Sequence, residues 1–167
     1  QTDKITGRIT KMIEQDLADD PYAQEYFSKL LQKAIEDAKA MFDAPVKQYM
    51  LFSEFEQEVK NRVVSDIPEE FKDNHRAQAY FGLFKHLFKG DLTLIEGTLA
   101  EESLVKYSFE IDEVVNKAVA EYSINPSEIK NAITTGLLPM LYGDLGIDNA
   151  QLFIAEVIKI TRLGIAR

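Results

Sequence analysis

The chain has 167 residues, of which 46% are hydrophobic and 28% are charged, enough for one well-buried domain. Its 19 Lys and Arg against 28 Asp and Glu give a formal net charge of -9, which repels a phosphate backbone and argues against general nucleic-acid binding. Because the chain has no cysteine, disulfides, thiolate metal sites and cysteine nucleophiles are excluded.

The chain carries no apolar run of about eighteen residues and no apolar signal core near its N-terminus. We therefore expect a cytoplasmic protein with no membrane partner. The sequence opens at Gln1 and enters a helical pattern at once. This opening suggests a fragment of a larger chain, although tag removal or N-terminal processing would leave the same end.

The first part of the chain predicts three helices. Thr2 or Asp3 caps the first, and Asp20-Pro21 starts a long second one. Pro45 breaks the pattern before a third helix that ends at about Val64. The second and third have similar lengths and a short joint, which predicts a long antiparallel hairpin from residue 22 to 64. The apolar residues of the hairpin outnumber those that one face needs: they include Phe27, Leu31, Phe42, Val46, Tyr49, Met50, Phe52, Phe55 and Val63.

The middle of the chain predicts a connection followed by a central helix. Residues 65 to 73 contain Pro68 and predict at most one helical turn, so the best internal boundary lies there. Asn74 then caps a helix that a glycine at position 90 ends. This helix contains four aromatic residues, and such side chains bury large apolar areas: Tyr80, Phe81, Phe84 and Phe88.

The last part predicts three more helices. The segment 90 to 97 fits either a short helix or an extended link. From about residue 100 a helix follows, with Asp112, Glu113 and Lys117 expected on its solvated face. A capping box at 125–128 starts the next helix, which Pro139 should kink or end. Turn glycines follow at 143 and 146, and Asp148 or Asn149 caps a final helix closed by Gly164.

These patterns predict an all-α fold, an irregular multi-helix bundle of about seven helices. We expect residues 1–167 to form a single helical domain, with a possible sub-boundary near 65–73. No alternating apolar pattern typical of strands is present.

No catalytic, metal-binding or cofactor-binding residues are expected. The only histidines, His75 and His86, lack the Glu-x-x-His context of a di-iron bundle, and an exposed or core-edge position explains them better than a metal does. Glycine-rich phosphate loops, nucleophile elbows and zincin motifs are missing. Adjacent acidic pairs such as Glu69-Glu70 are typical of solvated faces.

The aromatic row of the central helix has two interpretations. With Arg76, Lys85 and Lys89 as interleaved cations, it could stack on nucleic-acid bases. We favour the other interpretation, in which the aromatic side chains form the core and the cations form its solvated edge. Because charge from Lys72 to Lys89 runs against the acidic trend of the chain, Arg76, Lys85 and Lys89 are the candidates for contact with a nucleic-acid backbone.

Two segments resemble a known family. The first is Arg-Ala-Gln-Ala-Tyr-Phe-Gly at 76–82, and the second is Phe-Glu-Ile-Asp-Glu-Val-Val-Asn-Lys-Ala at 109–118, followed by the helical patterns at 128–133 and 145–148. They are similar to the C-terminal helical part of the restriction (R) subunit of type I restriction–modification enzymes. Two features depart from the family pattern: Pro139 interrupts a helix that the family usually continues, and the connection at 123–125 is shorter and less polar.

The resemblance implies a non-catalytic module that packs on the motor domains and docks to the methyltransferase core. The parent would be a site-specific deoxyribonuclease that translocates DNA with ATP and Mg, while this fragment would bind no cofactor. Methyltransferase and specificity subunits would be its partners, with DNA reached through the full complex. The alternative is a stand-alone helical adaptor domain for protein–protein interaction.

Overall fold

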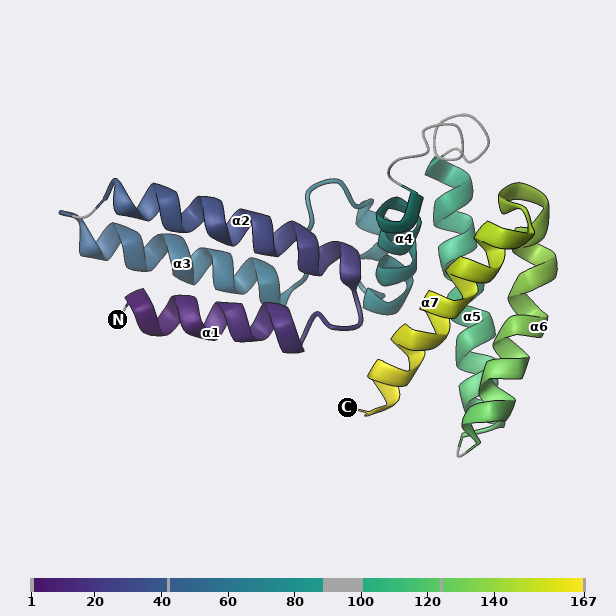
Figure 1. Ribbon diagram of the computed structural model, residues 1–167. Helices are drawn as coiled ribbons and strands as arrows, with labels where there is room; N and C mark the ends of the chain where they lie inside the picture. The colour runs from purple at the N-terminus through teal and green to yellow at the C-terminus, as the bar shows by residue number, and fades with distance from the viewer. Residues whose placement is uncertain (1, 42, 89–100, 124, 167) are drawn as a thin grey trace. The chain divides into compact units, whose positions relative to one another are not determined.

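The computed structural model describes residues 2–41, 43–88, 101–123 and 125–166 (Figure 1). Over these ranges the chain forms α-helices, one short 3-10 helix and no strand, so the predicted all-helical fold of about seven helices is confirmed. The elements are α1 (Thr2–Gln15), α2 (Pro21–Lys39), α3 (Pro45–Lys60), η1 (Glu69–Phe71), α4 (His75–Phe88), α5 (Glu101–Glu121), α6 (Pro126–Leu145) and α7 (Ile147–Ala166). They form two compact units, Gln1–Ile67 and Pro68–Arg167.

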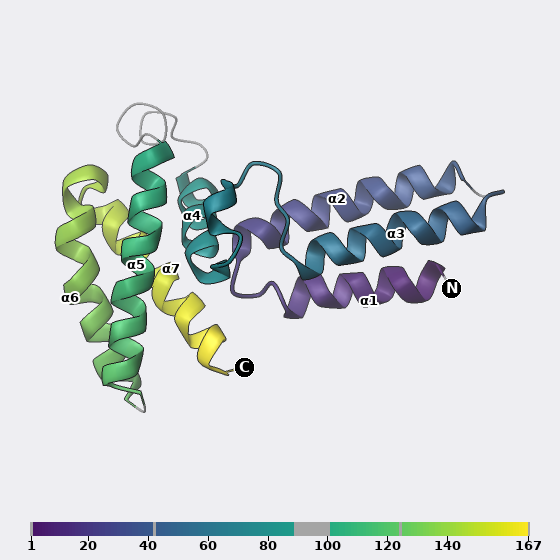
Figure 2. The ribbon, with the colours of Figure 1, turned by 180° about the vertical axis from the view of Figure 1, so that it is seen from behind.

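The N-terminal unit consists of α1, α2 and α3, which lie side by side in both views (Figures 1 and 2). Each helix buries one stripe, because its apolar residues recur at three- and four-residue spacing. Phe27 of α2 and Phe55 of α3 meet edge to face, with ring centroids 6.0 Å apart. Phe42 lies outside the described residues. The core of the unit also contains Ile5, Ile9, Ile13, Leu17, Leu31, Phe52 and Val59.

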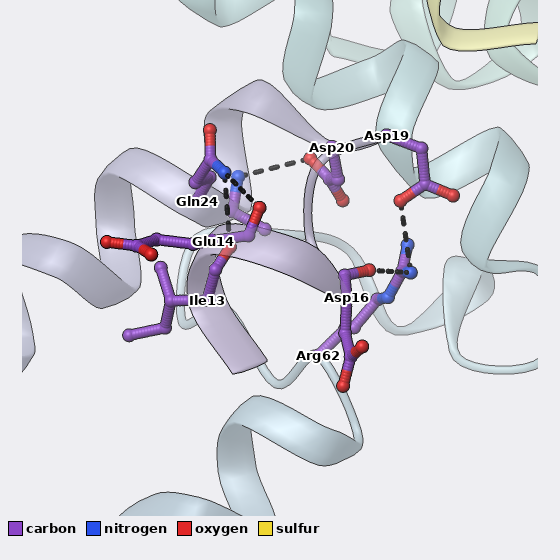
Figure 3. Close-up of polar contacts among 8 residues, drawn as sticks. Ile13, Glu14, Asp16, Asp19, Asp20, Gln24 and Arg62 are labelled. Carbon is purple, nitrogen blue, oxygen red and sulfur yellow. Dashed lines mark hydrogen bonds and ion pairs between the residues drawn. The ribbon is translucent and has the colours of Figure 1, made fainter. Parts of the chain in front are cut away.

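Polar contacts join α1 to the start of α2 (Figure 3). Asp20 caps α2 as predicted, because its Oδ1 accepts a hydrogen bond of 3.1 Å from the amide of Ala23. Gln24 Nε2 donates to the carbonyl oxygen of Ile13 at 3.1 Å and to that of Glu14 at 3.4 Å. The last carbonyl groups of α1 thus find donors on α2.

The end of α3 differs from the prediction, since the helix ends at Lys60 rather than near Val64. Arg62 has a φ of 53°, its amide donates to the carbonyl of Val59, and the Val63 amide donates to that of Glu58. This pair of bonds is the Schellman motif, in which glycine usually takes the left-handed position. Arg62 replaces glycine because its guanidinium reaches the carbonyl of Asp16 at 2.9 Å and Asp19 Oδ1 at 3.1 Å (Figure 3).

In the C-terminal unit, α4 is buried over most of its length. Asn74 caps this helix as predicted, with its Oδ1 accepting from the Ala77 amide at 3.0 Å. Every residue from 77 to 84 is buried, and the four aromatic side chains are at most 5% exposed, which confirms that they belong to the core. The ring of Phe84 stacks on that of Phe153 of α7 at 4.2 Å, while Phe71 of η1 stacks on Phe109 of α5 at 5.0 Å. Aromatic contacts therefore tie α4 to α7 and η1 to α5.

In this unit Pro139 does not end α6, Gly143 lies inside this helix rather than in a turn, and both bounds of the last helix differ from the prediction. The helix α6 continues through Pro139 to Leu145 and ends at Gly146, which has a φ of 78°. Proline removes one donor, but Pro139 and Thr135 are exposed, so water can bind the carbonyl that this donor would have served. The last helix likewise starts at Ile147, directly after Gly146, and runs past Gly164. The undecided segment 90 to 97 lies outside the described residues.

Candidate functional site

Arg76, the first of the three predicted nucleic-acid contacts, lies at the start of α4 and binds α5. Its guanidinium donates to Asn116 Oδ1, and its Nε lies 4.0 Å from Asp112 Oδ1. Asp112 Oδ2 accepts a hydrogen bond of 2.9 Å from Asn74 Nδ2. The charge of Arg76 is thus partly neutralised by a joint between α4 and α5, although its side chain is still about half exposed.

The position of Asp112 differs from the prediction. The periodicity places it on the solvated face of α5, but in the structure it is only 8% exposed. The buried sector of α5 is wider than one stripe, since this helix packs on both α4 and α6. A carboxylate inside this sector needs polar partners, which Asn74 and Arg76 provide.

Lys85, the second candidate, lies near the end of α4 and is half-buried. Its Nζ is 5.0 Å from the ring centroid of Phe81, a distance suited to a cation–π interaction. Lys89, the third candidate, lies outside the described residues. The aromatic rings are buried, so they do not form a stacking platform for bases on this helix.

The structure does not bring Arg76 and Lys85 together. Nine residues separate them on α4, which places them about half a turn apart around the helix and roughly 13 Å apart along its axis. Arg76 lies at the joint with α5, and Lys85 lies on the opposite side of α4. Contact of either residue with a nucleic-acid backbone stays a prediction.

His75 and His86 lie on a similar face of α4, but they are about 16 Å apart along the axis, too far to share one ion. Across the described ranges no group of three or more His, Cys, Asp or Glu residues could hold a metal ion. Within the same ranges no helix is both long and apolar enough to cross a membrane.

Three apolar residues on α3 are exposed and form a patch that we call the α3 face. Val46 is 71% exposed, Met50 is 56% exposed, and Tyr49 is 46% exposed. Their spacing of three and four residues places them on one side of the helix, away from the buried Phe52 and Phe55. The sequence contained this signal as a surplus of apolar residues, but the pattern did not say which of them would be exposed.

A second surface feature, which the sequence did not predict, is a groove of about 450 Å³ between α6 and α7. Leu138, Ile154 and Ile158 contribute its apolar lining, and Lys130, Lys159 and Arg162 contribute its cations. Two consecutive helices, joined at Gly146, supply these residues. Only the packing of α6 against α7 brings them together.

Tyr107 of α5 forms a polar contact with Asp144 of α6, which the sequence also did not predict. Its phenol donates to Asp144 Oδ2. The hydrogen bond to this carboxylate, together with partial burial, raises the pKa of Tyr107 to about 12. The contact fixes the end of α6 against α5, and neither residue lines the groove.

Comparison of the chain with protein-family models, with curated proteins and with solved structures gives no match.

Proposed function

We propose that this chain is a non-catalytic helical interaction module of a cytoplasmic protein: the C-terminal helical module of a type I restriction enzyme R subunit. It packs on the motor domains and docks to the methyltransferase core. The observation that carries the interaction role is the α3 face, where Val46, Tyr49 and Met50 expose apolar side chains at helical spacing. Contiguous apolar surface of this kind is typical of protein–protein contacts.

The geometry of the α3 face supports docking against a helix or groove of a partner. Residues spaced by three and four positions present a narrow apolar ridge, which is the pattern used when one helix lies in a hydrophobic groove. Exposed Tyr and Met are also enriched among interface residues. The predicted hairpin of residues 22 to 64 would be the docking element, and the identity of the partner rests on the resemblance of residues 76–82 and 109–118 to the R subunit.

Co-elution tests this proposal. The chain is mixed at micromolar concentration with the methyltransferase and specificity subunits of its source and passed over a size-exclusion column. We expect one peak that contains all three chains. Clean separation would contradict the R-subunit assignment, and co-elution with an unrelated partner instead would favour the stand-alone adaptor.

Variants locate the interface. The double substitution Val46→Asp, Met50→Asp places two charges on the α3 face and should abolish co-elution, because a buried unpaired carboxylate is costly. Leu152→Asp is the matched control, since Leu152 is also exposed, at 47%, but lies on α7. Circular dichroism verifies that both variants keep the helical fold. Equal co-elution of the wild type and the double variant would remove the α3 face from the interface.

A further inference from the structure

The groove between α6 and α7 combines an apolar lining with positive charge. Leu138, Ile154, Ala155, Ile158 and Leu163 line it together with three cations, Lys130, Lys159 and Arg162. None of the lining residues is Asp or Glu, although the whole chain carries a net charge of -9. The groove is therefore a positive site on an acidic protein.

The three cations are available to a ligand. Lys130, Lys159 and Arg162 are exposed, and in the described part of the chain none of them takes part in an ion pair. Cations on an apolar surface that lack an acidic partner favour a ligand that brings carboxylates.

The charge of the groove is concentrated at one end. The chain reverses at Gly146, so residues equally far from it on the two helices lie on corresponding levels: Lys130 with Arg162, and Leu138 with Ile154. The helices separate with distance from this reversal in both views (Figures 1 and 2). The open end of the groove is thus cationic, and the end near Gly146 is apolar.

The dimensions of the groove fit a short helix. The lining runs about 12 Å along α6 and about 18 Å along α7, which matches a helix of roughly 8–12 residues. A third helix laid between two packed helices buries its apolar side chains at three- and four-residue spacing. The lining contains no aromatic residue on which a nucleic-acid base could stack.

We propose that the groove between α6 and α7 binds an acidic amphipathic helix of a partner protein, with its apolar side chains on Leu138 and Ile158. Its carboxylates lie at the end formed by Lys130, Lys159 and Arg162. Because acidic residues are most favourable in the first turn of a helix, the N-terminus of the bound helix lies at this cationic end. This inference does not depend on the proposed function, since it uses neither the α3 face nor the family resemblance.

Fluorescence anisotropy with a labelled peptide of about twelve residues tests the inference on the full chain. The peptide has Leu at helical spacing and Asp or Glu in its first turn. Two controls have the same length: one replaces the acidic residues with Lys, and one carries a central Pro that breaks the helix. We expect saturable binding of the acidic helix alone. Failure of that peptide to bind, or equal binding of either control, would overturn the proposal.

Charge reversal in the groove provides the second test. The triple variant Lys130→Glu, Lys159→Glu, Arg162→Glu should weaken binding by about tenfold or more. Lys33→Glu is a control on an exposed lysine of α2 that does not line the groove. Raising salt from about 0.05 M to about 0.5 M should weaken binding to the wild type and to the Lys33 variant. Unchanged affinity of the triple variant, with its helical fold intact, would assign the peptide to another surface.

The apolar lining has a test of its own. Ile158 is half-buried, and Ile158→Asp places a carboxylate where the apolar side chains of the peptide lie. We expect this variant to lose binding. Ala155→Ser changes the polarity of an exposed lining residue with little change in size and should retain binding. If the Ile158 variant binds as the wild type does, the apolar part of the proposal is wrong.

Discussion

Gly136 of α6 lies directly against Val114 of α5. A methyl group on Gly136 would be 2.7 Å from Val114 Cγ1, closer than two carbon atoms can approach without a shift. The absence of a side chain therefore sets how closely α5 and α6 pack, and Val114 is β-branched, so its side chain has little freedom to move aside.

We expect Gly136→Ala to lower the free energy of unfolding by about 1–2 kcal/mol, because overpacking outweighs the better helix propensity of alanine. At Gly143 of the same helix an added methyl group would have no neighbour within 4 Å, so Gly143→Ala should instead stabilise by about 0.5–1 kcal/mol. Urea unfolding followed by circular dichroism measures both. A stabilising effect at both positions would show that α5 can move aside.

The second prediction concerns Arg62. Its left-handed backbone lowers the stability of the folded state, whereas the contacts of its side chain raise it. Arg62→Ala keeps the unfavourable backbone conformation and loses the contacts with Asp16 and Asp19, so it should destabilise the N-terminal unit. Arg62→Gly loses the same contacts but removes a backbone cost of about 1 kcal/mol, so it should be more stable than the alanine variant by about that amount. Urea midpoints rank the two, and the reverse order would contradict the Schellman assignment.

The contacts between α4 and α5 predict which of two substitutions, at Asp112 or at Arg76, lowers the free energy of unfolding more. Asp112→Ala leaves the partly buried Asn74 amide without its acceptor and should cost about 2 kcal/mol. Arg76→Ala should cost about 1 kcal/mol or less, because its side chain is about half exposed. Thermal unfolding of both variants tests the order. A larger loss for Arg76→Ala would indicate that the exposed cation, rather than the buried carboxylate, holds the joint.

Tyr107 predicts a change of stability at high pH. Its folded pKa of about 12 lies above the ordinary value of 10.0, so its contribution is fully present below about pH 10 and is lost as pH rises toward 12. Tyr107→Phe should be less stable than the wild type below pH 10, and the difference should shrink above it. Unfolding free energies at several pH values measure this, and a difference that is constant with pH would contradict the hydrogen bond to Asp144.

Local signals determined much of the fold. The positions of Asp20, Asn74 and Asn125 before periodic segments predict helix caps, and each accepts a backbone hydrogen bond in the structure. The size of the aromatic side chains of α4 predicts their place in the core, where the structure has them. Such features depend on neighbours within a few residues, so the sequence alone predicts them.

Two residues whose conformational preferences disagree with their positions, Pro139 and Arg62, were harder to predict. Pro139 lies inside α6, where exposed backbone can bind water, and Arg62 takes a position that normally favours glycine because distant partners hold its side chain. In both cases the propensity of one residue was outweighed by its surroundings.

By itself the sequence predicted most of the helical segments, the caps at Asp20, Asn74 and Asn125, and a surplus of apolar side chains over what one face requires. Only the tertiary structure decided that Val46, Tyr49 and Met50 are exposed, that Asp112 is buried, and that Lys130 and Arg162 border one groove. The physical reason is that periodicity specifies the faces of a helix but not their partners. Whether a side chain lies in the core, in a contact between helices or on an exposed surface depends on which helix, if any, packs against it.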